Sequence, residues 1–212
     1  MSWYDTFSGF YDLTVEPLYK KARKIGVDAL NLKEGDVVLD LACGTGPNFK
    51  HLSPLVGKTG LVIGLDYSKG MINKAKKKVA KNNWENVILI QEDARQISKE
   101  QITKYCGREI QFNNVIIVLG LSVIPEHEEV FENTYALLKP GGNYVIIDVY
   151  ADKFVPTSWW IKLLARADLK RKSWELLEKK TSGFSLNNIS KNRHLHGGLL
   201  YIASGKKKSG WR

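Results

Sequence analysis

One stretch decides the organisation of this chain: Val37-Val38-Leu39-Asp40-Leu41-Ala42-Cys43-Gly44-Thr45-Gly46-Pro47-Asn48. Its first five residues are apolar except for Asp40, which is the pattern of a short buried strand. Gly44 and Gly46 interrupt the run, and helical spacing follows from about Asn48. A strand, a glycine turn and a helix in this order predict a ligand-binding loop of an open α/β sheet. Glycine lets the backbone approach a ligand, and the free N–H groups of the next helix face it.

The residues around this turn narrow the choice of ligand. A dinucleotide-binding loop would carry glycine or alanine three residues after Gly46, where this chain has Phe49. A phosphate-binding loop would end in Gly-Lys-Ser/Thr, which is absent here. Asp40 at the strand end would repel a pyrophosphate, whereas it suits a cationic or zwitterionic ligand.

Acidic residues also follow the next two predicted strands. Residues 61–66 and 87–91 have the apolar pattern of buried strands, and Asp66 and Asp93 stand near their ends. A carboxylate at the end of the second strand can accept both ribose hydroxyls of a nucleoside. Tyr67 and Met71 would then pack on the adenine side. The order of glycine turn, Asp66 and Asp93 on successive strands predicts a nucleoside site.

The second half of the chain continues the alternation of strands and helices. Residues 112–119 indicate a fourth strand, and a helical pattern follows that ends at Lys139-Pro140-Gly141-Gly142. Residues 144–148 indicate a fifth strand, so this region is a βαβ unit. Residues 184–189 and 199–203 indicate two final strands. Near the start, Pro17 opens a helix in which Leu18, Ala22, Ile25 and Ala29 share a face, with Arg23 mostly opposite.

This order of motifs resembles the class I S-adenosylmethionine-dependent methyltransferases over roughly residues 4 to 150. Ala42 stands where many members have their first glycine, and the Leu-Lys-Pro-Gly-Gly turn at 138–142 is typical of the group. The resemblance implies an α/β fold: a Rossmann-like seven-stranded, mostly parallel sheet with the last strand antiparallel, helices on both faces and an N-terminal helical cap. It implies S-adenosylmethionine as the cofactor. The implied cofactor-binding residues are Asp40, Ala42, Gly44, Thr45, Gly46, Asn48, Asp66, Tyr67, Met71, Asp93, Ala94, Leu119 and Leu121.

The length of 212 residues predicts a single domain, 1–212. Its parts are an N-terminal helical cap at 1–30, a cofactor-binding core at 31–150, a helical substrate-side insertion at 151–182, the final two strands at 183–205 and a basic tail at 206–212.

In-line methyl transfer depends on alignment of donor and acceptor, and a hydroxyl or carbon acid also needs a general base. Candidates for catalysis are His127, His194, His196 and Tyr11, with Asp148 and Tyr150 as further candidate bases. No third ligand accompanies the two histidines at 194 and 196, so no metal site is expected. The sequence Gly120-Leu121-Ser122-Val123 replaces the Asn-Pro-Pro-Tyr signature of amine-selecting enzymes, which argues against adenine methylation in nucleic acid.

The net charge of +10 is compatible with several kinds of binding partner. Lysine-rich segments at 69–81 and near the C-terminus could meet nucleic acid, an anionic membrane or acidic substrates, or could be a solvated face. Trp159 and Trp160 beside basic residues suit a membrane interface, a pocket roof or core packing. No apolar run reaches the ~18 to 20 residues of a membrane span. The absence of a signal peptide and the two cysteines predict a cytoplasmic protein, with peripheral membrane contact as an open alternative.

The predicted function is methyl transfer to a small-molecule or lipid acceptor of the amine, thiol or quinone type. The whole pattern resembles the ubiquinone/menaquinone-type and phospholipid N-methyltransferase-like groups, and segments 43–50 and 173–178 look like thiol methyltransferases. The alternatives are a nucleic-acid-associated methyltransferase or an RNA/DNA-binding protein that uses the basic surface, and a cofactor-binding regulator without catalysis. Oligomeric state is not predicted.

Overall fold

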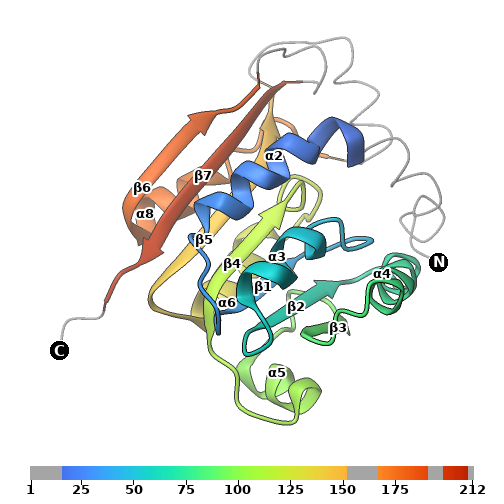
Figure 1. Cartoon of the computed structure of the whole chain (residues 1–212). Helices are drawn as coiled ribbons and strands as arrows, with labels where there is room; N and C mark the ends of the chain where they lie inside the picture. The colour runs from blue at the N-terminus through green and yellow to red at the C-terminus, as the bar shows by residue number, and fades with distance from the viewer. Residues whose placement is uncertain (1–15, 152–166, 191–197, 210–212) are drawn as a thin grey trace.

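The computed structural model describes residues 16–151, 167–190 and 198–209. Within these residues, seven strands form one sheet in the order β3-β2-β1-β4-β5-β7-β6 (Figure 1). The strands are β1 (Val37–Leu41), β2 (Leu61–Asp66), β3 (Val87–Gln91), β4 (Phe112–Val118), β5 (Leu138–Tyr150), β6 (Thr181–Asn188) and β7 (Leu199–Lys207). The pairs among β1 to β5 are parallel, and β7 is antiparallel to both of its neighbours. The predicted fold class is confirmed.

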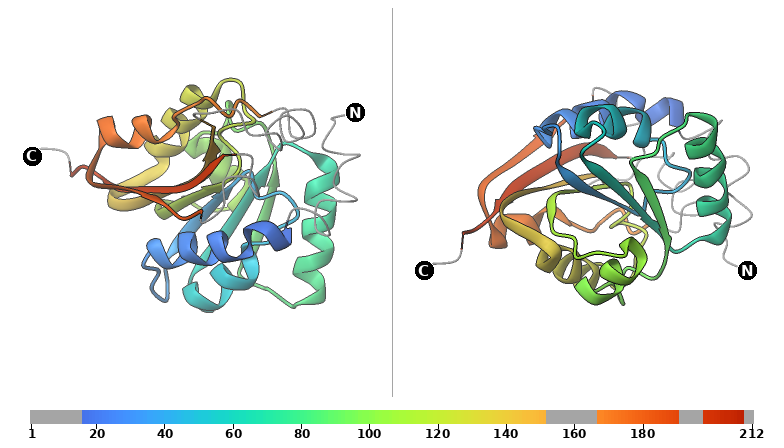
Figure 2. Two further views of the ribbon diagram at one scale, coloured as in Figure 1. Left: turned by 90° about the horizontal axis from the view of Figure 1, so that it is seen from above. Right: turned by 60° about the horizontal axis from the view of Figure 1, so that its bottom comes forward.

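Helices cover both faces of the sheet, because consecutive strand residues point to opposite sides. Val38 lies in one buried hydrophobic cluster and Leu39 in the other. The first cluster includes residues of α2 (Glu16–Ala29), α3 (Phe49–Val56) and α4 (Lys69–Lys81). The second includes residues of α5 (Lys99–Cys106), α6 (His127–Leu137) and α8 (Trp174–Lys180). Figure 2 shows these two helical layers with the sheet between them.

Helix α2 is rotated relative to the face that its sequence predicts: Ala22 is buried and Ile25 packs against the core as expected, but the rest of the face differs. Leu18 is 40% exposed and Ala29 is exposed, whereas Arg23 is only 2% exposed. The buried face consists of Tyr19, Ala22, Arg23, Gly26, Val27 and Leu30. Gly26 explains the rotation, because a Cβ at this position would lie 2.3 Å from Cδ1 of Ile147 on β5. The helix turns its smallest residue toward the sheet so that the two backbones can approach.

Strands β5, β6 and β7 extend beyond the ranges predicted for them, and β6 begins at Thr181, inside the predicted insertion. Strand β5 begins at Leu138, and its register with β4 shifts between the pairs Phe112↔Leu138 and Asn114↔Asn143. The Pro-Gly-Gly turn is therefore a bulge within β5. Strand β7 continues to Lys207, so the predicted basic tail begins inside a strand. Lys207 Nζ donates to the carbonyls of Tyr135 (2.9 Å), Ala136 (3.1 Å) and Leu138 (2.7 Å), which lie at the end of α6. The Tyr135 carbonyl also accepts the N–H of Leu138, so these bonds tie the end of β7 to the junction of α6 and β5.

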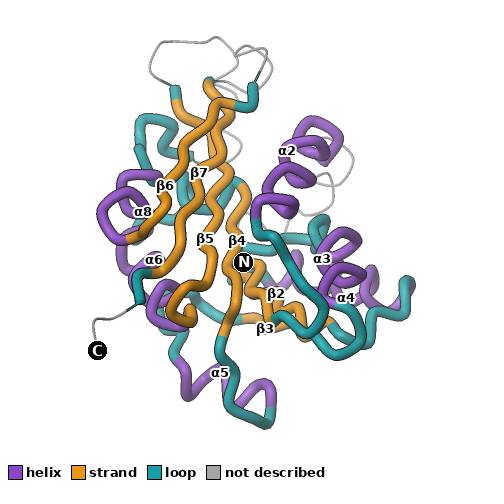
Figure 3. The backbone as a smooth tube through the Cα atoms, turned by 60° about the vertical axis from the view of Figure 1, so that its left-hand side comes forward, coloured by secondary structure: helices purple, strands orange, loops and turns teal. Residues whose placement is uncertain are grey.

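The strand order places a topological switch at β1, whose neighbours are β2 on one side and β4 on the other. Figure 3 follows the same order outward from β2 and β3 through β4 and β5 to β7 and β6. Ligands of open α/β sheets bind at such a point, beyond the carboxyl ends of the strands. Among the helices that the structure describes, none has the length and apolar character needed to cross a membrane.

Candidate cofactor and acceptor site

The glycine turn after β1 has a compact, left-handed backbone. The φ angles are +51° at Ala42, +57° at Gly44 and +76° at Gly46. Cys43 N–H donates to the Leu65 carbonyl at 3.0 Å, which ties the turn to the end of β2. A Cβ at Gly44 would meet no atom within 4 Å, so the space beside this glycine can accept a ligand.

Phe49 takes the place of a third glycine because its ring fills the space beneath the turn. The ring is fully buried, and a Cβ at Gly46 would lie 2.3 Å from its Cε2 atom. Gly64 on β2 leaves room for the same ring, since a Cβ there would lie 2.6 Å from Cζ of Phe49. Phe49, the residue that argued against a dinucleotide-binding loop, therefore has a packing role as well.

Ala42→Gly is expected to stabilise the protein. An L-residue in the left-handed region is strained by roughly 1 to 2 kcal/mol, and the greater freedom of glycine in the unfolded chain offsets part of the gain. We expect a net gain of about 1 kcal/mol, or a rise of roughly 2 to 4 °C in Tm. The matched control is Ala80→Gly on the exposed face of α4, which should lose about 1 kcal/mol. Equal losses in both variants would contradict the assigned strain.

Asp66 is half-buried at the end of β2 and faces the glycine turn. Its Oδ2 accepts the Gly44 N–H at 2.8 Å, and its Oδ1 accepts the Ser68 N–H at 2.9 Å. Ser68 is the N-cap of α4, where its hydroxyl accepts the Met71 N–H at 3.2 Å. A carboxylate accepts about four hydrogen bonds in all, so the same group can order both loops and bind ligand hydroxyls.

The residues expected around adenine lie after β2 and β3. Tyr67 is 65% exposed, which leaves its ring accessible for stacking, while Met71 is only 3% exposed. Asp93 accepts hydrogen bonds from Nε of Arg95 at 2.9 and 3.0 Å, and these bonds hold the pKa of the Asp93 carboxyl below its usual value. Ala94 is 8% exposed. The sequence did not predict the pairing of Asp93 with Arg95.

Asp40 lies at the centre of a buried polar chain. Asn48 Nδ2 donates to Asp40 Oδ1 at 2.8 Å, and Arg23 Nη1 donates to Asn48 Oδ1 at 3.1 Å. Burial raises the pKa of Asp40 to about 7, although Asn48 and Arg23 act in the opposite direction. Among the described residues, Asp40 Oδ2 has no hydrogen-bond partner. A buried acceptor without a partner fits the α-ammonium group at the zwitterionic amino-acid end of S-adenosylmethionine.

Asp40→Asn should stabilise the cofactor-free protein above neutral pH. The folded-state pKa lies about three units above the ordinary 3.8, so the protein loses stability as pH rises from about 4 through 7. Three units correspond to about 4 kcal/mol, and the unpartnered amide of the variant offsets part of this. We expect a gain of about 2 kcal/mol at pH 8 and little difference near pH 4, measured by urea unfolding. A constant difference across this range would show that Asp40 does not titrate there.

The loop after β4, residues 119–124, is held by Asp148 of β5. Asp148 accepts the Ser122 N–H at 2.9 Å, the Ser122 hydroxyl at 2.7 Å and the Val149 N–H at 2.9 Å. Its side chain is buried, and burial raises the pKa of the carboxyl. Both oxygens therefore accept hydrogen bonds that hold the loop after β4, and the hypothesis that Asp148 acts as a general base stays a prediction. Leu119 in this loop has a φ of +59°, and the side chain of Leu121 is fully buried.

Residues 168–171, a segment in the described part of the predicted insertion, contact the same loop. Asp168 N–H donates to the Ser122 carbonyl at 2.7 Å, and Arg171 Nη1 donates to the carbonyls of Leu121 and Ile124 at 2.5 Å each. Beside it, the ring of Trp174 meets the rings of Tyr150 and Tyr201 edge-on, with centroids 5.0 and 4.8 Å apart. The loop after β4 is thus fixed from both sides.

Of the four predicted catalytic residues, His127 lies in the described part of the chain. His127 begins α6, and its neighbour Glu126 pairs with Arg95 at 3.1 Å, which places His127 on the side of Asp93. The other predicted catalytic residues, Tyr11, His194 and His196, lie outside the described residues, as do Trp159 and Trp160. In the described ranges, no three side chains of His, Cys, Asp or Glu gather as a metal site would require.

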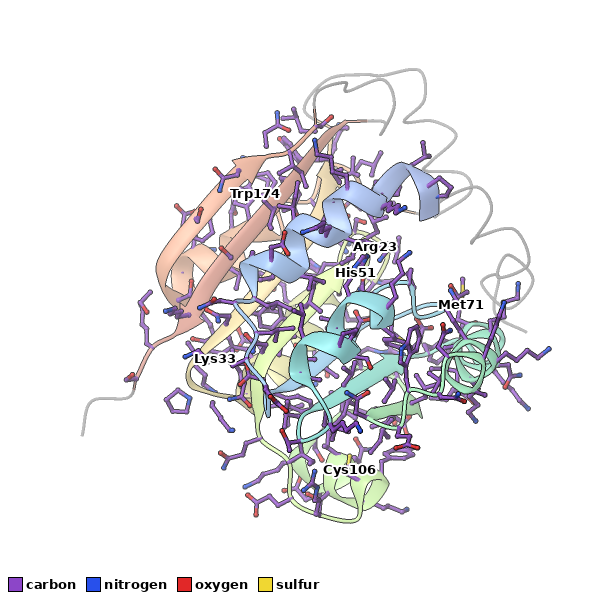
Figure 4. The ribbon with its side chains drawn as sticks, viewed as in Figure 1. Arg23, Lys33, His51, Met71, Cys106 and Trp174 are labelled. Atoms are coloured by element: carbon purple, nitrogen blue, oxygen red, sulfur yellow. The ribbon has the colours of Figure 1, made fainter. Side chains whose placement is uncertain are left out.

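Two cationic residues, Lys78 and Arg23, lie near the turn, and the sequence did not predict either of them there. Thr45 is fully buried, and Nζ of Lys78 on α4 lies 3.4 Å from its hydroxyl. Arg23 reaches Asn48 from α2, and Figure 4 shows it between that helix and α3. One feature of the sequence could have predicted the burial of Arg23. Gly26 lies one turn later on the same side of the helix, and a small residue marks the face that packs closely.

Comparison with known proteins supports a common family. Residues 32–196 match the family described as a methyltransferase domain. The demethylmenaquinone methyltransferase of Oceanobacillus iheyensis is 36% identical over 130 residues, which are 61% of this chain and 51% of that protein. The chain spans about half the length of the first curated relatives that it matches.

Solved structures share the fold. A SAM-dependent methyltransferase from Aquifex aeolicus has a TM-score of 0.65 at 20% identity, covering 95% of this chain and 97% of that one. Phospholethanolamine N-methyltransferase 2 of Haemonchus contortus, in complex with phosphomonomethylethanolamine and S-adenosylhomocysteine, has a TM-score of 0.71 at 15% identity, covering 97% and 58%. The predicted membership of a methyltransferase family is confirmed by the match over residues 32–196, and the predicted fold agrees with these structures. With its glycine turn, its strand order and the match over residues 32–196, the chain belongs to the methyltransferase domain family.

Proposed function

We propose that this protein transfers a methyl group from S-adenosylmethionine to a quinone-type small molecule. The observation that carries the choice of acceptor is the 36% identity to a demethylmenaquinone methyltransferase over 130 residues. Two further curated relatives with the same name are each 32% identical over 130 residues. The arrangement of the polar residues around the glycine turn supports the cofactor half of the reaction.

In this proposal, each part of the cofactor meets its own group of residues. Asp66 accepts the ribose hydroxyls, and Tyr67 packs on the adenine ring, whose amino group donates to Asp93. The backbone N–H of Ala94 donates to a ring nitrogen, and Asp40 meets the amino-acid end beside the glycine turn. When bound, S-adenosylmethionine supplies an activated methyl group, so the main task of the protein is to align the acceptor with it.

The acceptor lies beyond the loop at 119–124, which Asp148 and Arg171 hold in place. A quinone-type ring in its hydroxylated form is a better methyl acceptor once it has lost a proton, and this step needs a base. His127 lies toward the adenine side, so the proposal assigns the base to His194, His196 or Tyr11. A lipid-soluble acceptor would be met at a membrane surface, and peripheral contact through Trp159 and Trp160 is part of the same proposal.

The test is methyl transfer from labelled S-adenosylmethionine to a demethylated menaquinone that is kept chemically reduced in its hydroxylated form and, in parallel, to a total cell extract separated into organic, aqueous and nucleic-acid fractions. The proposal predicts label in the quinone and in the organic fraction, and none with the Asp66→Ala variant. Label confined to the nucleic-acid fraction would overturn the proposed acceptor and give the lysine-rich helix α4 a role in binding polyanions. Label in an aqueous amine or thiol would likewise replace the quinone.

A further inference from the structure

Arg23, Asn48 and Asp40 form a continuous buried connection from α2 to the glycine turn. The relative exposures of these residues are 2%, 1% and 0%, and two hydrogen bonds of 3.1 and 2.8 Å link them. Burying two charged groups and an amide is costly unless each is paired. Such an arrangement at the end of β1, beside a ligand-binding turn, indicates a role in the site and not only in packing.

The amide of Asn48 joins the two charged groups in one orientation only. Asn48 is the N-cap of α3, yet its side chain makes no hydrogen bond to the start of its own helix. A guanidinium only donates, so Asn48 must turn its oxygen to Arg23 and its NH₂ group to Asp40. The position of Arg23 therefore determines how the amide presents its donor to the carboxylate.

Charges of both signs face Asp40. Arg23 of α2 opposes the effect of burial, whereas Asp66 at the end of β2 reinforces it, and the neutral Cys43 lies in the same turn. Among the described groups that act on Asp40, Arg23 is the cation. The ionised form of Asp40 thus depends on a residue contributed by another element, 17 positions earlier in the chain.

We infer that Arg23 is a positioning residue for the cofactor: it orients Asn48, and through it holds Asp40 in place and in the ionised form that meets the α-ammonium group of S-adenosylmethionine. This inference rests on the proposed function for the identity of the ligand. It makes the docking of α2 and the binding of the cofactor coupled events, because the same side chain serves both.

The experiment measures the affinity for S-adenosylhomocysteine, which cannot donate a methyl group, by calorimetry between about pH 6 and pH 9. Arg23→Gln keeps a donor for Asn48 and removes the charge, so the pKa of Asp40 rises and the binding profile moves to higher pH. We expect about tenfold weaker binding at pH 7 and a smaller difference at pH 9, where Asp40 is ionised in both proteins. Arg23→Lys keeps the charge and should stay close to the parent profile.

Two controls separate this role from general stability. Lys24→Gln removes one positive charge from the exposed side of the same helix and should leave the profile unchanged. In an Asp40→Asn background, Arg23→Gln should cause no further pH-dependent loss, because the group through which Arg23 acts no longer titrates. Thermal unfolding of each variant confirms that the protein is folded. Should Arg23→Gln not fold, Asn48→Leu breaks the same connection while keeping the charge of Arg23. The Asn48 hydrogen bond also lowers the pKa of Asp40, so binding should weaken most between pH 6 and 7 and less at pH 9.

An Arg23→Gln profile that coincides with that of the parent would overturn the inference while leaving the proposed function intact. An equal loss in the parent and in the Asp40→Asn background would do the same, since Arg23 would then act without the Asp40 carboxylate. Failure of the parent chain to bind S-adenosylhomocysteine at any pH would overturn the proposed function, and the inference with it.

Discussion

Asp66→Ala should weaken binding of S-adenosylhomocysteine by about 10²- to 10⁴-fold at pH 7. A hydrogen bond to a charged group contributes about 1.5 to 3 kcal/mol, and the carboxylate is expected to accept two ribose hydroxyls. The same substitution releases the N–H of Gly44, which Asp66 holds at 2.8 Å. The loss combines missing ligand contacts with a less ordered glycine turn, and calorimetry measures their sum.

Two further variants separate these effects. Asp66→Asn keeps an oxygen that can accept one backbone N–H, so it should preserve part of the loop and lose less affinity. Asp28→Ala removes a carboxylate from the exposed pair with Lys24 on α2, and it should bind as the parent does. Parent-like affinity in Asp66→Ala would mean that the end of β2 does not bind the ribose.

Asp148→Ala should lower the free energy of unfolding by about 3 kcal/mol. It leaves the N–H and hydroxyl of Ser122 and the N–H of Val149 without their acceptor in a buried position. Methyl transfer should fall further than cofactor affinity, because Asp148 fixes the loop after β4 on the acceptor side. Urea unfolding and cofactor titration of the same preparation measure the two effects.

Asp168→Ala is the matched control for Asp148→Ala. The Asp168 side chain is 55% exposed and pairs with Arg171 at 3.8 Å, so its loss should change stability by less than about 1 kcal/mol. A parent-like unfolding free energy in Asp148→Ala would show that the loop keeps its position without the carboxylate, and that the bonds to Ser122 contribute little.

The local features of the cofactor side follow directly from the sequence. The glycine turn, Asp66 and Asp93 each depend on a few consecutive residues, where an apolar run ends and a polar or flexible residue begins. Parallel strands bring such ends to one edge of a sheet, so their proximity also follows once the strands are recognised. The antiparallel β7 followed from the resemblance alone, since its apolar pattern carries no direction.

The buried partners of charged residues depend on the tertiary structure. Helical periodicity placed Arg23 opposite the apolar face, but Gly26 rotates α2 toward Ile147 and carries Arg23 inward with it. Asp148 had the sequence context of a base at a strand end, and the structure adds two hydrogen bonds from Ser122, 26 residues away in the chain.

The sequence by itself determined the parallel strands, the glycine turn and the acidic residues near the ends of β2 and β3, because these depend on local pattern and on the geometry of parallel strands. Only the tertiary structure decided that Arg23 is linked to Asp40 through Asn48 and that Asp148 accepts hydrogen bonds from the loop after β4. Burial and long-range hydrogen bonds set the ionisation and the orientation of a carboxylate, and neither is encoded in the residues next to it.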